Sequence, residues 1–325
     1  MSAEPTRAAP TPAGDLQRRQ HHGLVLATVS AAAFGSSGPM GKALLEAGWS
    51  PAAAVLLRLG GSALLLLVLA LLLERDRLRL DRRRVKVLVV YGIVAMAGVQ
   101  LAFFNAVRTL DVGVALLLEY LAPVLLLAWT SIRARQRPPT LTLVGAGLTL
   151  IGLMLVLDLT GARSVDPVGV AWGLLAAVCL AGYFTLSARQ DADLPPLVMA
   201  AGGTLVGATT LALAGVVGIV DLTATTGDAV LAGVTVSMLV PAAWLVLIST
   251  SAAYLTGIAA VVRLGSRSAS FVSLSEVLFA ILVAWLVLSE LPSLVQLLGG
   301  VSILTGIVLI QRYERGVGEV IPPTT

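Results

Sequence analysis

The chain is poor in the residues that build metal sites and nucleophilic enzymes. Among its 325 residues there is one cysteine, Cys179, and there are two histidines, His21 and His22. A single cysteine excludes an internal disulfide and a cysteine metal cluster. Because both histidines precede the first apolar run, we expect no buried histidine metal site, no catalytic triad and no cofactor.

Charge is also scarce, and apolar residues are in excess. Only 12% of the residues are charged and 57% are hydrophobic, with a mean hydropathy of +0.93. A soluble globular chain is typically about 25% charged and about 45–50% apolar. The composition therefore indicates an integral membrane protein. Basic residues lie between the apolar runs, so we interpret them as topology signals and not as a nucleic-acid surface.

Ten apolar runs approach the roughly 20 residues that a transmembrane helix needs. The predicted spans are 23–44, 52–73, 87–107, 112–131, 140–158, 168–187, 196–217, 240–262, 269–289 and 293–311. They predict an all-α, multi-pass protein of a bacterial plasma (inner) membrane.

Three segments fall outside these spans. Residues 1–22 form a polar tail that we expect to be disordered, and residues 312–325 form a second tail. The longest connection, about 218–239, contains AVLAGVTVSMLV, which we expect along the membrane interface. Of the 22 Lys and Arg residues, 18 fall on the side that holds both termini, and 3 fall on the other. Cytoplasmic segments carry such an excess, so both termini are predicted to be cytoplasmic.

An internal repeat divides the chain into two halves. LVGAGLTLIGLMLVL (143–157) and LLGGVSILTGIVLIQ (297–311) share leucines and glycines at five of fifteen positions. Five spans per half is an odd number, so the second half is inserted upside down relative to the first. The predicted repeats are 23–158 and 168–311. Inverted repeats are typical of alternating-access transporters, whose substrate site lies near the midplane.

Three stretches of the sequence resemble a known family. They are AVLLRLGGSALLLL (54–67), AFFNAVRTLDVGVALLLEYLAPVLLLAW (102–129) and residues 252–310. The chain resembles the ten-helix EamA-like permeases of the drug/metabolite transporter superfamily, and VALLLEYLAP is most similar to the threonine/homoserine exporter branch. Two features depart from the family pattern, Glu276-Val277 in place of Glu-Pro and Arg133-Ala-Arg-Gln-Arg in place of Gly-Glu-Arg, so the resemblance does not settle a substrate.

Two acids, Glu119 and Glu276, lie inside predicted spans. A rise of 1.5 Å per residue places each about 12–14 Å deep, from opposite faces of an apolar layer about 30 Å thick. A charge at that depth costs at least about 2.5–3.5 kcal/mol on insertion scales, and such residues usually face a cavity or a partner. We interpret both as sites for substrate ammonium or protons. The alternative is a pair of glutamates that only cross-link helices.

Arg58, in the second span, is the third charge at depth. It is either a counter-charge to Glu119 and a clamp for a substrate carboxylate, or a side chain that snorkels outward. Two acids and one arginine in a single cavity favour a zwitterion such as an amino acid.

Other polar residues are weaker candidates. Pro123 removes the backbone hydrogen bond to the carbonyl of Glu119, which predicts either a hinge or a kink absorbed by neighbouring helices. The stretch GSSGPMGK (35–42) resembles a phosphate loop but lacks its spacing, so we expect its glycines and proline to kink the first helix or to let it pack closely. The further candidates for cavity residues are Gln100, Asn105, Tyr120, Tyr183, Ser249, Thr250, Ser251 and Tyr254.

The leading hypothesis is a secondary transporter that exports a small polar metabolite, an amino acid such as threonine or homoserine, with or without proton coupling. Its expected partners are the small-molecule substrate and the lipid bilayer, and not nucleic acid; a homodimer is left open. The nearest rival is efflux of drug-like cations by the same fold. An intramembrane enzyme, a channel and a non-transporting membrane subunit are further alternatives.

Overall fold

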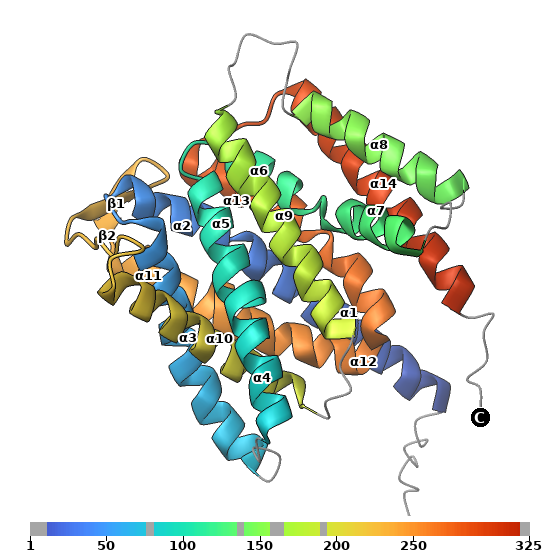
Figure 1. Ribbon diagram of the computed structural model, residues 1–325, viewed down its shortest axis with the longest axis horizontal. Helices are drawn as coiled ribbons and strands as arrows, with labels where there is room; N and C mark the ends of the chain where they lie inside the picture. Colours follow the sequence, from blue (N-terminus) through green and yellow to red (C-terminus); the bar gives the residue numbers. More distant parts are fainter. Residues whose placement is uncertain (1–11, 76–80, 135–139, 157–165, 189–193, 319–325) are drawn as a thin grey trace, which may run out of the picture.

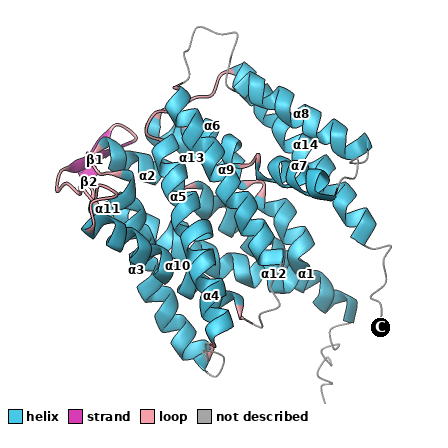
Figure 2. Cartoon of the chain, in the orientation of Figure 1, coloured by secondary structure: helices cyan, strands magenta, loops and turns pink. Residues whose placement is uncertain are grey.

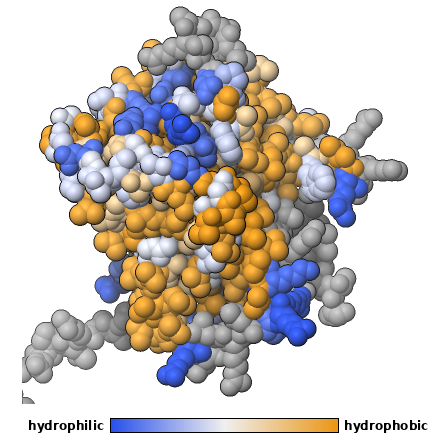
Figure 3. Space-filling view, turned by 60° about the vertical axis from the view of Figure 1, so that its left-hand side comes forward, coloured by the Kyte–Doolittle hydropathy of each residue, from blue (hydrophilic) through white to orange (hydrophobic). Residues whose placement is uncertain are grey.

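In the computed structural model, the described residues are 12–75, 81–134, 140–156, 166–188 and 194–318. They are almost entirely helical (Figures 1 and 2). Six helical segments are long and apolar enough to cross a membrane, and four shorter apolar helices complete the set. These ten segments follow the ten predicted spans. In the view of Figure 3, hydrophobic residues form a belt across the molecule, with hydrophilic residues gathered above and below it.

In the first half, several spans consist of more than one helix. The bounds are α1(Pro12–Gly35), α2(Ser37–Glu46), α3(Pro51–Leu73), α4(Arg82–Tyr91), η2(Gly92–Gly98), α5(Val99–Ala106), α6(Val112–Glu119), α7(Ala122–Ala134) and α8(Thr140–Val156). Helix α1 begins before the predicted start of the first span, within the tail expected to be disordered; residues 1–11 of that tail lie outside the described residues.

The second half repeats this pattern. The bounds are α9(Pro167–Ala188), α10(Pro196–Val216), β1(Asp228–Leu231), β2(Val234–Ser237), α11(Leu239–Val246), η3(Leu247–Ala252), α12(Ala253–Ser273), α13(Glu276–Leu288) and α14(Leu294–Gly318). The π-helical segments η2 and η3 interrupt the third and eighth spans at corresponding places. Such π-helical turns within helices are frequent at functional sites. Residues 319–325 of the second tail are not among the described residues.

The two halves interlock through pairs of helices. Helix α3 packs on α10, α8 packs on α14, α1 packs on α12 and α13, and α9 packs on α5 and α6. Each of these contacts joins one half to the other. The first helix of the first half, α1, packs on α12 and α13 of the second half, and the first helix of the second half, α9, packs on α5 and α6 of the first half. Figure 1 shows α8 and α14 side by side at one edge of the molecule. This exchange is the arrangement expected of two repeats related by a two-fold axis.

Glycines allow α8 and α14 to pack closely. A Cβ added to Gly152 would lie 2.6 Å from the carbonyl oxygen of Gly299, and one added to Gly299 would lie 2.7 Å from that of Gly152. Gly306 approaches the backbone at Gly145 in the same way. These four glycines occupy two of the five positions shared between 143–157 and 297–311, 145/299 and 152/306. Their matching therefore reflects a real contact, because small residues let membrane helices approach.

The segment expected along the membrane interface, residues 229–240, forms a β-hairpin and the start of α11. Strands β1 and β2 pair antiparallel from Asp228–Ser237 to Leu231–Val234, around a two-residue turn at Ala232 and Gly233. Both turn residues have positive φ, 52° and 76°. Such a turn matches the twist of the strands. The N–H of Ala232 donates to the carbonyl of Val287, 2.8 Å away, which docks the hairpin on the end of α13.

Candidate functional site: a polar cavity between the halves

Two membrane spans are interrupted next to the glutamates. Helix α6 ends at Glu119 and α7 begins at Ala122, whereas α12 ends at Ser273 and α13 begins at Glu276. Both interruptions are two residues long and lie 154 residues apart, the same shift that aligns 143–157 with 297–311. The glutamates therefore flank equivalent helix breaks, one before its break and one after it.

Pro123 lies in the first turn of α7. At that position its missing N–H costs no helical hydrogen bond, so the proline favours the start of a new helix. Val277 occupies the corresponding position in the second half, and α13 nevertheless begins there.

Opposite helix ends give the two carboxyl groups different surroundings. Glu276 is in the first turn of α13, where the helix dipole and free N–H groups stabilise a negative charge. Glu119 is the last residue of α6, where the dipole opposes one. Glu119 therefore gains more from binding a cation or a proton.

A small polar cavity brings three predicted charges together. Its volume is about 40 Å³, and its lining includes Arg58, Gln100, Glu119 and Glu276. The other lining residues are Phe34, Gly35, Ser37, Gly38, Phe103, Val112, Leu116 and Ala280. The lining comes from both halves, as in transporters built from inverted repeats. Ligand pockets usually measure about 300–1,000 Å³, so this cavity must enlarge before it holds a metabolite.

The Arg58 side chain is anchored by protein acceptors on three sides. It is 2% exposed, and its Nε donates to Thr250 Oγ1 at 2.7 Å, its Nη1 to Gln100 Oε1 at 2.6 Å and its Nη2 to the carbonyl of Ser249 at 3.3 Å. Ser249 and Thr250 belong to η3, whose distorted turn supplies both acceptors. Buried charges need such partners, and the structure contradicts the snorkelling alternative.

The approach of α3 to the end of α11, directly before η3, depends on a glycine. A Cβ on Gly61 would lie 2.8 Å from the side chain of Val246, and Ser62 donates to the Val246 carbonyl at 3.1 Å. The LLRLGGS stretch thus places Arg58 where it reaches the second half.

The two acids differ in their hydrogen bonds. Tyr120 Oη donates to Glu276 Oε2 at 3.1 Å, which links the break after α6 to the start of α13. Among the described residues, no hydrogen bond or ion pair reaches the carboxyl group of Glu119. Its side chain is partly exposed and lines the cavity. Glu119 is therefore the carboxyl group available to a ligand.

Several predicted cavity residues lie elsewhere. Asn105 donates to the carbonyl of Leu101 in its own helix, and Ser251 donates to that of Val246. Tyr254 donates to Met96 Sδ and packs edge-on against Phe34, outside the cavity lining. The side chain of Tyr183 is outside the described residues. Asn105 and Ser251 thus bond within their own spans, as Asn and Ser commonly do in membrane helices, whereas Tyr254 contacts the other half.

Sequence reasoning missed a polar cluster beside the cavity. Trp244 Nε1 donates to Ser36 Oγ at 2.8 Å, and the hydroxyls of Ser36 and Ser249 share a hydrogen bond of the same length. Glu290 was also missed, because it follows the ninth span and has no local feature that points to a partner. Lys42 and Glu290 form a partly buried ion pair between the halves.

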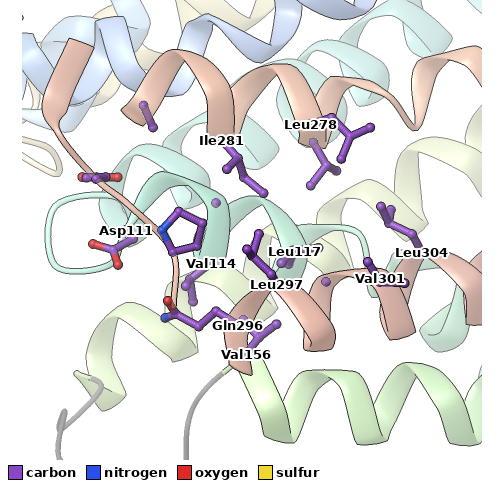
Figure 4. A pocket seen from close by; sticks show the side chains of 16 residues that line it. Asp111, Val114, Leu117, Val156, Leu278, Ile281, Gln296, Leu297, Val301 and Leu304 are labelled. Atoms are coloured by element: carbon purple, nitrogen blue, oxygen red, sulfur yellow. The ribbon is translucent and has the colours of Figure 1, made fainter. Parts of the chain in front are cut away.

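A larger pocket of about 310 Å³ lies between α6, α13 and α14, and it is less suited to a polar substrate. Figure 4 shows Asp111 and Gln296 at one end of it and Val301 and Leu304 at the other. Its lining is apolar apart from that end. Helices α6 and α13 contribute to both the pocket and the cavity, so they lie between the two.

Comparison of the sequence with models of known protein families identifies the family of the chain. The profile of the EamA-like transporter family matches residues 21–158 and again residues 167–312. The chain belongs to the EamA-like transporter family. It is therefore a multi-pass membrane transporter with two EamA repeats, and not an enzyme.

Known relatives are distant. The chain is 25% identical over 237 residues to an inner membrane transporter, YicL of Salmonella typhimurium, a match that covers 72% of this chain and 76% of that protein. It is 28% identical over 140 residues to the threonine/homoserine exporter RhtA of Escherichia coli K12, covering 43% and 45%. A solved crystal structure shares the fold, with a TM-score of 0.55, 19% identity and coverage of 93% and 98%. These likenesses place the protein among inner membrane transporters.

Proposed function

We propose that this EamA-family protein is a secondary transporter that exports a small amine-bearing metabolite, an amino acid such as threonine or homoserine, by alternating access. The observation that carries the proposal is Glu119, a carboxyl group inside the membrane without a hydrogen bond in the described part of the chain. It lines a cavity shared by both halves. Burying a carboxyl group without a partner costs free energy, and binding a cation or a proton offsets that cost.

The two carboxyl groups have different roles in this proposal. Glu276 accepts from Tyr120 and lies at a helix N-terminus, and in this proposal it serves as the counter-charge to Arg58. Glu119 exchanges a proton for the substrate ammonium, which couples export to a proton gradient. The helix breaks at 120–121 and 274–275 supply the two places where the cavity walls can move.

The zwitterionic substrate is supported by Arg58, which has five N–H donors and donates three hydrogen bonds to protein acceptors. Two N–H groups therefore remain to hold a substrate carboxylate. Partial similarity to the threonine/homoserine exporter is consistent with that class. A second candidate is efflux of organic cations. The three hydrogen bonds of Arg58 support it as well, because a guanidinium held by protein acceptors serves equally well as a structural counter-charge to the two carboxyl groups, without binding a substrate carboxylate.

Counterflow in proteoliposomes tests the proposal. Vesicles preloaded with unlabelled solute are offered labelled amino acids, nucleosides and organic cations, with and without a pH gradient. We expect saturable exchange of an amino acid that responds to the gradient. Exchange of organic cations without any amino acid would favour the second candidate, and no exchange of any solute in the panel would refute both. Both termini are taken as cytoplasmic here, and a homodimer is not part of the proposal.

A further inference from the structure

An ion pair links the two halves at the start of α6, the helix whose Val112 and Leu116 line the cavity. Lys42 in α2 pairs with Glu290, and Lys42 Nζ also donates to the carbonyl of Leu110 at 3.0 Å. The second carboxylate oxygen of Glu290 accepts from the N–H of Val112 at 2.9 Å, at the start of α6. Lys42 and Val112 belong to the first half and Glu290 to the second. The cluster is on the side that the distribution of basic residues predicts to face outward.

The cluster holds a wall of the cavity. Val112, whose N–H it binds, also lines the cavity with its side chain, together with Leu116 one turn deeper. The side chains of Lys42 and Glu290 are 13% and 14% exposed, so solvent screens their attraction less than that of a surface pair. Releasing Glu290 therefore frees the outer end of α6.

The stretch GSSGPMGK (35–42) brings α2 against this wall. A Cβ on Gly38 would lie 2.5 Å from Val112 Cγ1, and one on Gly41 would lie 2.5 Å from the ring of Phe104. Pro39 cannot donate to the carbonyl of Gly35, and the helix is interrupted at Ser36. The stretch thus contains a break, three close-packing glycines (Gly35, Gly38 and Gly41) and, at its end, the lysine of the ion pair.

The corresponding position of the first half carries no acid. A shift of 154 residues takes Glu290 to Gln136, a neutral residue followed by Arg137. In the sequence, therefore, the repeat does not reproduce the acid of the ion pair; Gln136 itself lies outside the described residues.

We propose that residues 35–42 form the outer gate of the transporter, latched by the Lys42–Glu290 pair and the N–H of Val112, and that this latch biases the resting protein toward its outward-closed state. The inference rests on the proposed alternating access. Opening the latch lets α2 swing about Ser36 away from α6, which exposes the cavity from outside.

Thiol labelling tests the gate without any substrate. The sole cysteine, Cys179, is replaced by alanine, and Leu116→Cys places a reporter in the cavity. A membrane-impermeant thiol reagent is then added from outside. We expect slow labelling with the latch intact and labelling faster by at least about tenfold in Glu290→Gln and Lys42→Met, because each variant removes a charge-assisted bond.

Two further variants separate the latch from damage to the fold. The double swap Lys42→Glu/Glu290→Lys restores the attraction of the pair but not the bond from the N–H of Val112, because lysine has no acceptor, so labelling is expected to slow only part of the way. Glu46→Gln, an exposed position one turn along α2, is the matched control and should label slowly. Slow labelling in Glu290→Gln, or labelling in monodisperse protein that is as fast in the swap as in the single variants, would overturn the proposal. A negative counterflow result would refute the proposed transport and leave this labelling result standing.

Discussion

Replacing Gly152 with alanine tests the contact between the fifth and tenth spans. The added Cβ would lie 2.6 Å from the carbonyl oxygen of Gly299 and 2.8 Å from the backbone nitrogen of Ile303. Neither atom belongs to a flexible side chain, so α8 and α14 must separate by about 0.8 Å to reach an ordinary 3.4 Å contact. Such overpacking typically costs about 1–3 kcal/mol.

Gly147, on the same helix, is the matched control because nothing lies within 4 Å of its added Cβ. Alanine is favoured over glycine in a helix interior by about 1 kcal/mol, and both variants receive that gain. The clash therefore sets the difference between them, about 1–3 kcal/mol.

Thermal unfolding in detergent measures this difference. We expect Gly147→Ala to match or exceed the wild-type Tm, and Gly152→Ala to unfold several degrees below Gly147→Ala. On the second helix, Gly299→Ala should lower the Tm more than Gly300→Ala, since the nearest atom to a Cβ on Gly300 is 3.5 Å away. Equal Tm values for Gly147→Ala and Gly152→Ala would show that the helices do not meet as described.

Three further predictions concern other parts of the molecule. Ser50→Ala should cost about 1 kcal/mol in detergent unfolding, because it removes the cap of α3 and the 2.6 Å bond to the carbonyl of Asp221. Arg58→Lys should fold but lose most counterflow activity, since lysine cannot reproduce three donors in a fixed plane; wild-type activity would contradict the anchoring. The hydroxyl of Thr109, with the first N–H groups of α9, lowers the pKa of Asp166, so Asp166→Asn should lower the Tm at neutral pH. That deficit should disappear as the pH falls through the lowered pKa, where the native carboxylate is protonated, and a deficit independent of pH would refute it.

Much of the architecture follows from the sequence because lipid imposes simple rules. Apolar runs have to be helices, and this rule located the ten helical segments. The glycines at 145, 152, 299 and 306 carried the repeat, and the structure shows why, since they meet at one interface. Depth counting placed Glu119 and Glu276 at the middle of the membrane, and both line the cavity.

The remaining features depend on contacts between distant residues. Pro123 signalled the first helix break, but no proline marks the equivalent break before Glu276. Two of the three acceptors of Arg58 lie about 190 positions away in η3, at Ser249 and Thr250. The spacing of residues along the sequence does not reveal a contact between positions so far apart. The hairpin turn at Ala232 carries little local signal either, because alanine rarely adopts a positive φ.

The most direct test of the account is the transport activity of Glu119→Gln beside Glu46→Gln, measured by counterflow with the solute that the wild type exchanges best. Glutamine keeps the shape of Glu119 and removes its charge and its exchangeable proton. We predict a loss of at least about tenfold for Glu119→Gln, the scale expected when a charge-assisted contact to the substrate is removed, and an unchanged rate for Glu46→Gln. Wild-type exchange by correctly folded Glu119→Gln would contradict the claim that this carboxyl group binds the substrate.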